Sequence, residues 1–328
     1  MQWKGIKESM EYFDIPVCLF LFQRKDTVLR IIERISHVKP KKIYLMCDQG
    51  RNDEEKQRVA ECREAVEKAI NWECEIIRDY ASENRGVFEN IGMGAMRVFE
   101  HEETAIFLED DNLPEITFFQ YCKEMLEKYK ENDRIVWVCG TNYLANYSND
   151  TNDSYMFTQH LLPCGWASWK TKYEKYYDAY FSNFNDSVIT RIKPGYRNNP
   201  LYKQQMEVIQ REYERMKKGE KFRSWDYQMC FSIRANDLLG ISPAKNQIKN
   251  IGVDAFSEHG GVSFTDKMTK RFCGMESHPL EFPLHHPATV LIDPVYEAKI
   301  GKIILYPLDW RIRKPFGKLK RKILGQKI

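Results

Sequence analysis

The segment "TAIFLEDDNLPEITFF", residues 104–119, runs an apolar stretch directly into three consecutive carboxylates, Glu109, Asp110 and Asp111. The run 104–108 is typical of a buried strand, and a helical pattern follows the acids. Adjacent carboxylates raise each other's pKa and weaken a fold unless a cation lies among them. The segment therefore predicts either a solvated loop or a metal site at the end of a strand.

The chain on both sides of this segment alternates between short apolar runs and amphipathic stretches. The runs are continuous enough for strands buried on both faces, as in "IPVCLFLF" (15–22). Alternation of this kind predicts an α/β fold with an open, mostly parallel, Rossmann-like sheet flanked by helices. We expect strands over 15–22, 41–48, 74–80, 104–110 and 134–140, and helices over 26–38, 53–70, 87–102 and 116–130.

Ligands of such sheets bind outside the carboxyl ends of the strands. Arg24 follows the first expected strand, Asp48 follows the second, and the acidic triplet follows the fourth. These side chains should therefore meet on one rim. The chain has no GxGxxG after its first strand and no GxxxxGK[ST], which disfavours a dinucleotide site or a P-loop.

Carboxylate oxygens in a row suit Mn²⁺ or Mg²⁺, which also bridge to substrate phosphates. Such a cation neutralises the charge that develops on a diphosphate leaving group. Arg24 would add a second positive contact, and Asp48 could accept hydrogen bonds from a base or ribose. Alternatively, the acids simply begin the next helix, with Asp111 or Asn112 near its N-cap. The strand-end position, with Pro114 behind it, favours the metal.

Several ordered motifs resemble those of the GT-A glycosyltransferases, whose Asp-x-Asp signature has a variant in "FLEDDNLPEITFFQYCKEML" (107–126). The resemblance is closest to the N-acetylglucosaminyltransferase I-like group and its bacterial, hemolysin-associated-protein-like relatives. It covers roughly residues 14–260. The supporting motifs are "FQRKD" (22–26), "CDQG" (47–50), "SENRG" (82–86), "PCGWASWKTKYEKY" (163–176) and "SWDYQMCFSIRAND" (224–237).

The resemblance implies an inverting, metal-dependent transfer from a nucleotide-sugar, most simply a UDP-sugar, with Mn²⁺ or Mg²⁺ as cofactor. It implies that Asp111 contacts the metal directly and that Asp110 contacts the sugar or ribose, with Glu109 behind them. The remaining nucleotide-sugar contacts would be Asp48 to the uracil, Arg24 to the phosphates, and Arg85 of "SENRG".

The same resemblance makes Asp226 the catalytic base, which agrees with the need for one carboxylate to take the proton of the acceptor hydroxyl. Its alternative role is to begin a helix, where an aspartate suits the dipole. Trp166 and Trp169 would stack on an acceptor sugar or else lie in the core, and Gly165 would allow close backbone approach. His259 is a weaker candidate metal ligand, because a histidine before two glycines is more often a turn residue.

Composition and charge indicate the cellular compartment and the surface at which the protein would work. The 328 residues hold nine cysteines without a CxxC pair, and the first residues lack the apolar stretch of a signal peptide, so we expect reduced thiols and a cytoplasmic protein. The last eighteen residues, "RIRKPFGKLKRKILGQKI", hold eight Lys or Arg and no acid, whereas the rest of the chain is net acidic. This amphipathic, helical tail would lie on the inner face of an anionic membrane. A solvated tail and RNA contact are alternatives, although we expect no nucleic-acid partner.

The expected organisation is a GT-A catalytic domain over 1–288 and an extension with the basic tail over 289–328. Within the domain, 14–140 would bind the nucleotide-sugar and 141–288 the acceptor, a glycan or lipid-linked surface-polysaccharide intermediate. Two other functions remain open: a nucleotidyltransferase on the same fold, disfavoured because "FLFQRKDTV" lacks a glycine-rich loop, and a non-catalytic module that docks on membranes.

Overall fold

The computed structural model describes residues 12–253 and 267–312. Its first half follows the predicted alternation closely. The elements are β1 (Val17–Leu21), α1 (Lys25–Ser36), β2 (Lys42–Cys47), α2 (Asp53–Ala69), β3 (Glu75–Tyr80), the π-helical turn η1 (Phe88–Gly92), α3 (Met93–Phe99), β4 (Thr104–Glu109), β5 (Asn112–Pro114), α4 (Thr117–Lys128) and β6 (Ile135–Cys139).

The second half mixes short strands with the longer helices. Its elements are β7 (Tyr155–Thr158), β8 (Trp166–Trp169), α5 (Lys170–Tyr176), α6 (Asp186–Ile192), the 3₁₀ turn η2 (Lys193–Gly195), α7 (Asn199–Lys217), α8 (Tyr227–Ala235), β9 (Leu239–Pro243), β10 (Ile248–Asn250), α9 (Lys267–Phe272) and α10 (Pro294–Ile304).

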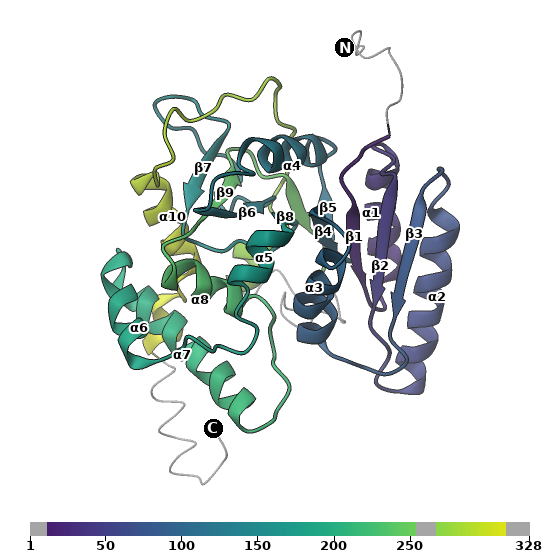
Figure 1. The fold of residues 1–328 in the computed structure, drawn as a ribbon, viewed down its shortest axis with the longest axis horizontal. Coiled ribbons are helices and arrows are strands. Elements are labelled where there is room, and N and C mark those ends of the chain that lie inside the picture. Colours follow the sequence, from purple (N-terminus) through teal and green to yellow (C-terminus); the bar gives the residue numbers. More distant parts are fainter. Residues whose placement is uncertain (1–11, 254–266, 313–328) are drawn as a thin grey trace.

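One sheet runs through both expected halves in the order β3-β2-β1-β4-β8-β6-β9-β7. The pairs β3-β2, β2-β1, β1-β4 and β6-β9 are parallel, while β8 lies antiparallel between β4 and β6, and β7 pairs antiparallel with β9. Figure 1 shows β1–β3 with α1 and α2 at one end of the molecule, and α6, α7 and α10 at the other. The predicted α/β fold with a mostly parallel sheet is confirmed.

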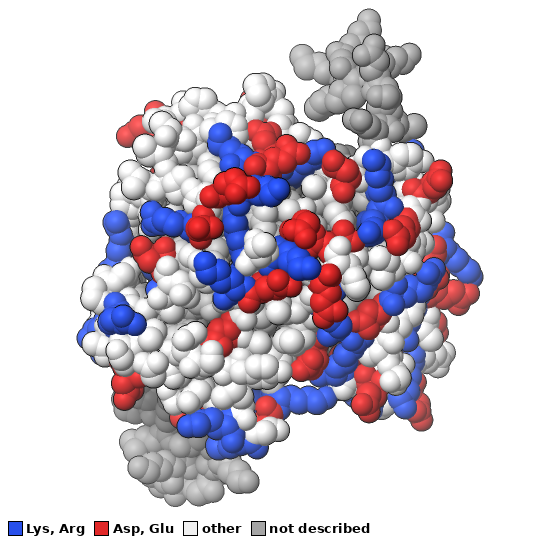
Figure 2. All heavy atoms as spheres, viewed as in Figure 1, with Lys and Arg blue, Asp and Glu red and all other residues white. Residues whose placement is uncertain are grey.

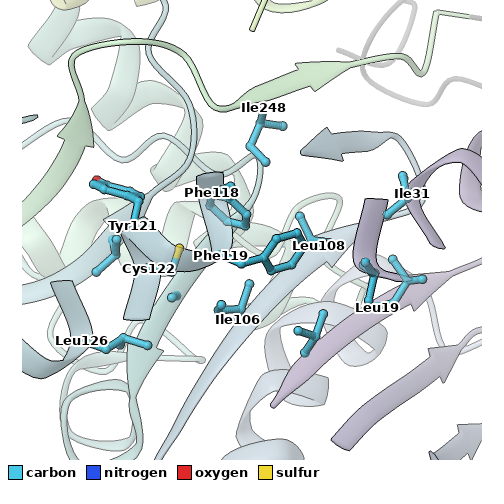
Figure 3. Packing of buried hydrophobic residues seen from close by; sticks show 14 of the residues in the cluster. Leu19, Ile31, Ile106, Leu108, Phe118, Phe119, Tyr121, Cys122, Leu126 and Ile248 are labelled. Carbon is cyan, nitrogen blue, oxygen red and sulfur yellow. The ribbon is translucent and has the colours of Figure 1, made fainter. Parts of the chain in front are cut away.

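Alternate residues of the central strands feed two cores, because successive side chains of a strand point to opposite faces. In β1, Val17, Leu19 and Leu21 pack with α1, α2 and α4, while Cys18 and Phe20 pack with η1 and α3. Figure 3 shows the first core, where Phe118 and Phe119 of α4 lie against the sheet. Helices therefore cover both faces of the sheet. Their packing holds the strands in place, and with them the strand ends that carry the predicted site.

The helix expected over 87–102 begins instead with the π-helical turn η1. A Cβ on Gly92 would lie 2.1 Å from the hydroxyl oxygen of Tyr177, and that hydroxyl donates to the carbonyl of Trp225. Glycine is therefore required here for close packing of the segment before α8, rather than marking a weak helix.

The C-terminal region described here is anchored to the body. Tyr296 and Ile300 of α10 are buried, and α10 contacts α7 and β7. The predicted basic tail (311–328) lies outside the described residues except for its first two, and His259 also lies outside them. Within residues 12–253 and 267–312, none of the helices is both long and apolar enough to cross a bilayer.

Candidate functional site

Arg24 supplies the cation that the acidic triplet requires. Its Nη1 lies 3.2 Å from Oδ1 of Asp110 and 3.2 Å from Oδ2 of Asp111. The backbone N–H of Phe22 also donates to Asp110, at 3.2 Å. These contacts join the end of β1 to the end of β4, which are parallel neighbours in the sheet. The predicted convergence of Arg24 with the triplet is therefore present.

The acids end a strand and do not cap the next helix. Helix α4 begins at Thr117 with Ile116 at its N-cap position, after the short strand β5. Asn112, the first residue of β5, is buried and donates to Oδ1 of Asp111 at 2.5 Å. Its own side-chain oxygen accepts from the backbone N–H of Gly165 at 2.8 Å. The helix-cap alternative is therefore wrong, and β5 holds the acids in place.

The strand that pairs with β5 brings a stretch of backbone against Asp111. Strand β10 pairs antiparallel with β5, and the N–H of Ile251 donates to the carbonyl of Asp111 at 2.9 Å. A Cβ on Gly252 would lie 2.4 Å from Oδ2 of Asp111. Only a glycine lets this backbone pass so close to the carboxylate. The sequence does not identify Gly252 and indicates Asn112 only as a helix cap, because strands of three residues carry too little pattern to detect.

The electrostatics of the rim favour a further cation. Burial, the carboxylates of Asp111 and Asp110, and the charge of Asp226 raise the pKa of Glu109 well above its usual value. Burial raises the pKa of Asp110 to about 7, although Arg24 acts in the opposite direction. Three acidic side chains thus raise the pKa of Glu109 while Arg24 lowers it, and a divalent cation would offset the repulsion among the acids.

Asp226 stands at the N-cap position of α8 and is half-buried. Its side chain does not cap the helix, and instead its Oδ1 accepts from the hydroxyl of Ser224. Its charge contributes to the raised pKa of Glu109, so it lies within electrostatic reach of the triplet. The helix-start alternative is met in position, because α8 begins directly after Asp226, although the carboxylate makes no capping hydrogen bond.

Asp48 holds a turn. Its Oδ1 accepts from the backbone N–H groups of Gln49 and Arg85, both at 2.8 Å. Its Oδ2 accepts from the N–H of Gly86 at 2.8 Å and from the amide of Asn84 at 3.1 Å. A carboxylate has about four lone-pair sites. Direct contact with a uracil would therefore require one of these bonds to break.

The side chain of Arg85 points away from Asp48. Its guanidinium forms a two-pronged contact with Asp79, at 2.7 and 3.0 Å, and Arg97 binds the same carboxylate at 2.8 Å. Gly86 follows with a φ of +85°, a conformation that glycine adopts without strain. The backbone N–H groups of Arg85 and Gly86 thus hold the "SENRG" segment to Asp48 at the end of β2, while the side chain of Arg85 binds Asp79.

The Gly-Trp segment lies in the core. Trp166 is 1% exposed and lies between Phe107 and Trp137, with ring centroids 4.0 Å away on each side. Trp169 is 3% exposed and donates to the carbonyl of Leu126. Neither ring face is open to a sugar in this conformation, so the core alternative describes both residues. Gly165, with a φ of +61°, packs against Ile248.

Among residues 12–253 and 267–312, no group of three or more His, Cys, Asp or Glu side chains forms a metal cluster. The donor set of the rim nevertheless fits a hard cation, because Mg²⁺ and Mn²⁺ are commonly held by one or two carboxylates together with waters and substrate phosphates. Asp111 and Asp110 are the residues placed to hold such an ion. Ser224, which holds Asp226, was missed because a serine beside a Trp-Asp pair has no distinctive spacing.

No protein-family model and no curated protein matches this chain. Among solved structures, a mannosyltransferase from Pyrobaculum calidifontis, in complex with GDP-Man and Mn²⁺, is similar at 12% identity over 71% of this chain and 73% of that chain, with a TM-score of 0.38. A UDP-glucose pyrophosphorylase complexed with UDP-glucose is similar at 12% identity over 73% and 94%, with a TM-score of 0.33. The glucosyl-3-phosphoglycerate synthase of Mycobacterium tuberculosis shares 10% over 52% and 64%, at 0.28. Likenesses this weak do not assign the chain to an enzyme class.

Proposed function

We propose that this chain is a metal-dependent, inverting glycosyltransferase of the GT-A type that uses a nucleotide-sugar, most simply a UDP-sugar. The observation that carries the proposal is the meeting of Arg24 with Asp110 and Asp111 at the carboxyl ends of β1 and β4. Anionic and cationic groups of the kind that bind a metal-chelated diphosphate lie together there, in the position where such sheets bind ligands. The ordered sequence motifs support the same reading.

Each residue then has a defined task. Asp111 and Asp110 would hold Mn²⁺ or Mg²⁺, whose charge would stabilise the departing diphosphate. Arg24 donates hydrogen bonds from the same rim to phosphate oxygens. Glu109, whose pKa is raised, adds a buried carboxyl behind the two aspartates.

Asp226 is the proposed general base. In a single displacement, the acceptor oxygen forms a bond to the anomeric carbon as the bond to the diphosphate breaks, and a carboxylate takes the hydroxyl proton. Ser224 orients Asp226 by donating to its Oδ1. The backbone of 84–86, held by Asp48, forms the wall of the nucleotide site beside β2.

The donor assay tests this function. The protein is incubated with UDP-sugars and Mn²⁺, with and without glycan acceptors, and released UDP is measured. Asp226→Asn should abolish transfer and leave UDP affinity near normal, because a neutral amide cannot take the proton but occupies the same volume. Loss of UDP binding in Asp226→Asn would contradict the base assignment. Formation of UTP and a sugar 1-phosphate from the UDP-sugar and added pyrophosphate, with no release of UDP, would indicate a nucleotidyltransferase.

We further propose that the acceptor is lipid-linked and that the C-terminal end meets an anionic membrane. Leu308, Trp310 and Ile312 are exposed, at 62, 39 and 54%, where the basic sequence begins at Arg311. Exposed apolar side chains beside cationic ones are typical of membrane-surface segments. Co-sedimentation with phosphatidylglycerol vesicles should fall when Leu308 and Ile312 are both changed to Ser; binding that is unchanged would refute this contact.

A further inference from the structure

A polar cavity lies at the opposite end of α8 from Asp226. It encloses about 120 Å³ between the N-terminus of α7, the last turn of α8 and the body of α10. Helix α8 runs from the Asp226 end to Arg234, which lines this cavity, so the two sites are roughly 12 Å apart along the helix axis. The volume is several times the about 10–15 Å³ that one ordered water requires.

The floor of the cavity is a buried, charge-balanced network. Arg234 donates to Oε1 of Glu297 at 3.1 Å and to Nδ1 of His160 at 3.3 Å. Nε2 of His160 lies 3.1 Å from the backbone carbonyl of Glu297, to which it donates in the neutral tautomer that both contacts require. Within this network the arginine and the glutamate cancel each other, so the floor itself adds no net charge.

Two further cations line the cavity and leave it net positive. Arg197 and Lys302 are exposed, and neither has a hydrogen bond or ion pair with any residue that the structure describes. The 19-residue helix α7 begins at Asn199, just after Arg197, and its N-cap residue Asn198 also lines the cavity. The positive end of its dipole therefore adds to the two side-chain charges.

An unpartnered buried hydroxyl is the independent sign of a ligand. Tyr196 lines the cavity and is 8% exposed, and within the described residues its hydroxyl has no hydrogen-bond partner. Its ring lies 4.3 Å from the guanidinium of Arg234. Burying a hydroxyl without a partner costs about 1–3 kcal/mol. An acceptor oxygen from a bound molecule would remove that cost.

We propose that this cavity binds an oxyanion of the phosphate class, either free phosphate or the phosphate of a monoester. Arg197 and Lys302 supply the charge, Tyr196 donates its hydroxyl, and Arg234 and Glu297 hold the walls in place. The proposed nucleotide-sugar site takes no part in this binding, so the inference can be tested independently of the proposed transferase function.

Calorimetry with inorganic phosphate at constant ionic strength tests the proposal. The measurement uses the whole chain in EDTA-treated, metal-free buffer. We expect saturable binding that weakens about tenfold or more in Arg197→Ala/Lys302→Ala, because two charge-assisted contacts are lost. Tyr196→Phe keeps the ring and should weaken binding through loss of the hydroxyl alone. Lys203→Ala, which removes an exposed cation of α7 outside the cavity, should have no effect.

Two outcomes would overturn the proposal. One is phosphate binding that is equal in wild type and the double variant; the other is binding that is lost in Arg24→Ala, which would place the anion at the acidic rim. Repeating the titration with glycerol 3-phosphate separates the two sources. Tighter binding of the ester, lost in the same double variant, supports an organic phosphate as the occupant, and equal binding supports free phosphate.

Discussion

Asp48, at the end of β2, has a different role from the one that its position in the sequence predicts. Asp48 follows the second strand, where a ligand contact was predicted, but four donors from residues 49 and 84–86 occupy its carboxylate. Its task in this structure is to fix the turn around Gly86. Sequence position identifies which residues reach the rim, whereas the local turn decides what they bind.

Asp48→Asn tests this positioning role. The amide nitrogen cannot accept from the N–H groups that face it, so we expect the free energy of unfolding to fall by about 1–3 kcal/mol. Urea unfolding of the full chain measures this directly. Asp150→Asn, in an exposed loop, is the matched control and should leave stability unchanged. Equal stability of the Asp48 variant would show that the four bonds do not hold the turn.

The Trp166 and Trp169 pair illustrates why some site residues could not be assigned from sequence. An indole suits both a sugar-binding platform and a packed core, and the local sequence around it is the same in either case. Burial between Phe107 and Trp137 is a product of β8 entering the sheet antiparallel between β4 and β6. That insertion depends on pairings distant in the chain, which local periodicity does not report.

At the scale of elements, long periodic segments were predicted well and short ones were not. All five strands expected in the first 140 residues are present, because most are continuous apolar runs and all lie next to amphipathic helices. Strands β5 and β10 each span three residues, yet their pairing places Gly252 on Asp111. The geometry of the site thus rests on the elements with the weakest sequence signal.

Gly252→Ala tests that dependence. The added methyl would lie on Oδ2 of Asp111, so either the strand end or the carboxylate must move. We expect affinity for Mn²⁺ to fall by about tenfold, as is usual when a group supporting a metal ligand is disturbed. Gly195→Ala, where a Cβ meets nothing closer than 3.9 Å, is the control. Unchanged Mn²⁺ affinity in Gly252→Ala, measured by calorimetry, would contradict the placement of Asp111.

The attachment of α10 has a predictable pH dependence. Burial lowers the pKa of His160 to about 4, so this histidine is neutral when folded and gains a proton on unfolding below its ordinary value near 6.5. Its contribution to stability is complete above about pH 6.5 and is lost as pH falls towards 4. Between pH 6.5 and 5 this amounts to about 2 kcal/mol.

Urea unfolding at several pH values measures this effect. His160→Gln cannot titrate, so its stability should decline less than that of wild type over the same interval. His101→Gln, at an exposed position, should keep the wild-type dependence. Parallel curves for wild type and His160→Gln would show that His160 is not buried neutral against Arg234 and Glu297.

For the whole molecule, one continuous sheet joins the two halves that we propose to bind the nucleotide-sugar and the acceptor. On the face seen in Figure 2, basic and acidic side chains are interspersed. The acidic cluster of the proposed site is local, at the end of β4 and the start of α8. Composition and net charge could not have revealed it, whereas the strand-end rule did.

The central claim is that Asp111, beside Asp110 and Arg24, binds a divalent cation together with a nucleoside diphosphate. Calorimetric titration of UDP into the full chain, with and without Mn²⁺, tests it most directly, with Asp111→Asn as the variant and the exposed Asp133→Asn as the control. We predict that Mn²⁺ strengthens UDP binding in wild type and in Asp133→Asn, and that Asp111→Asn loses this strengthening while remaining folded. UDP binding that is absent, or that responds to Mn²⁺ equally in all three proteins, would contradict the account.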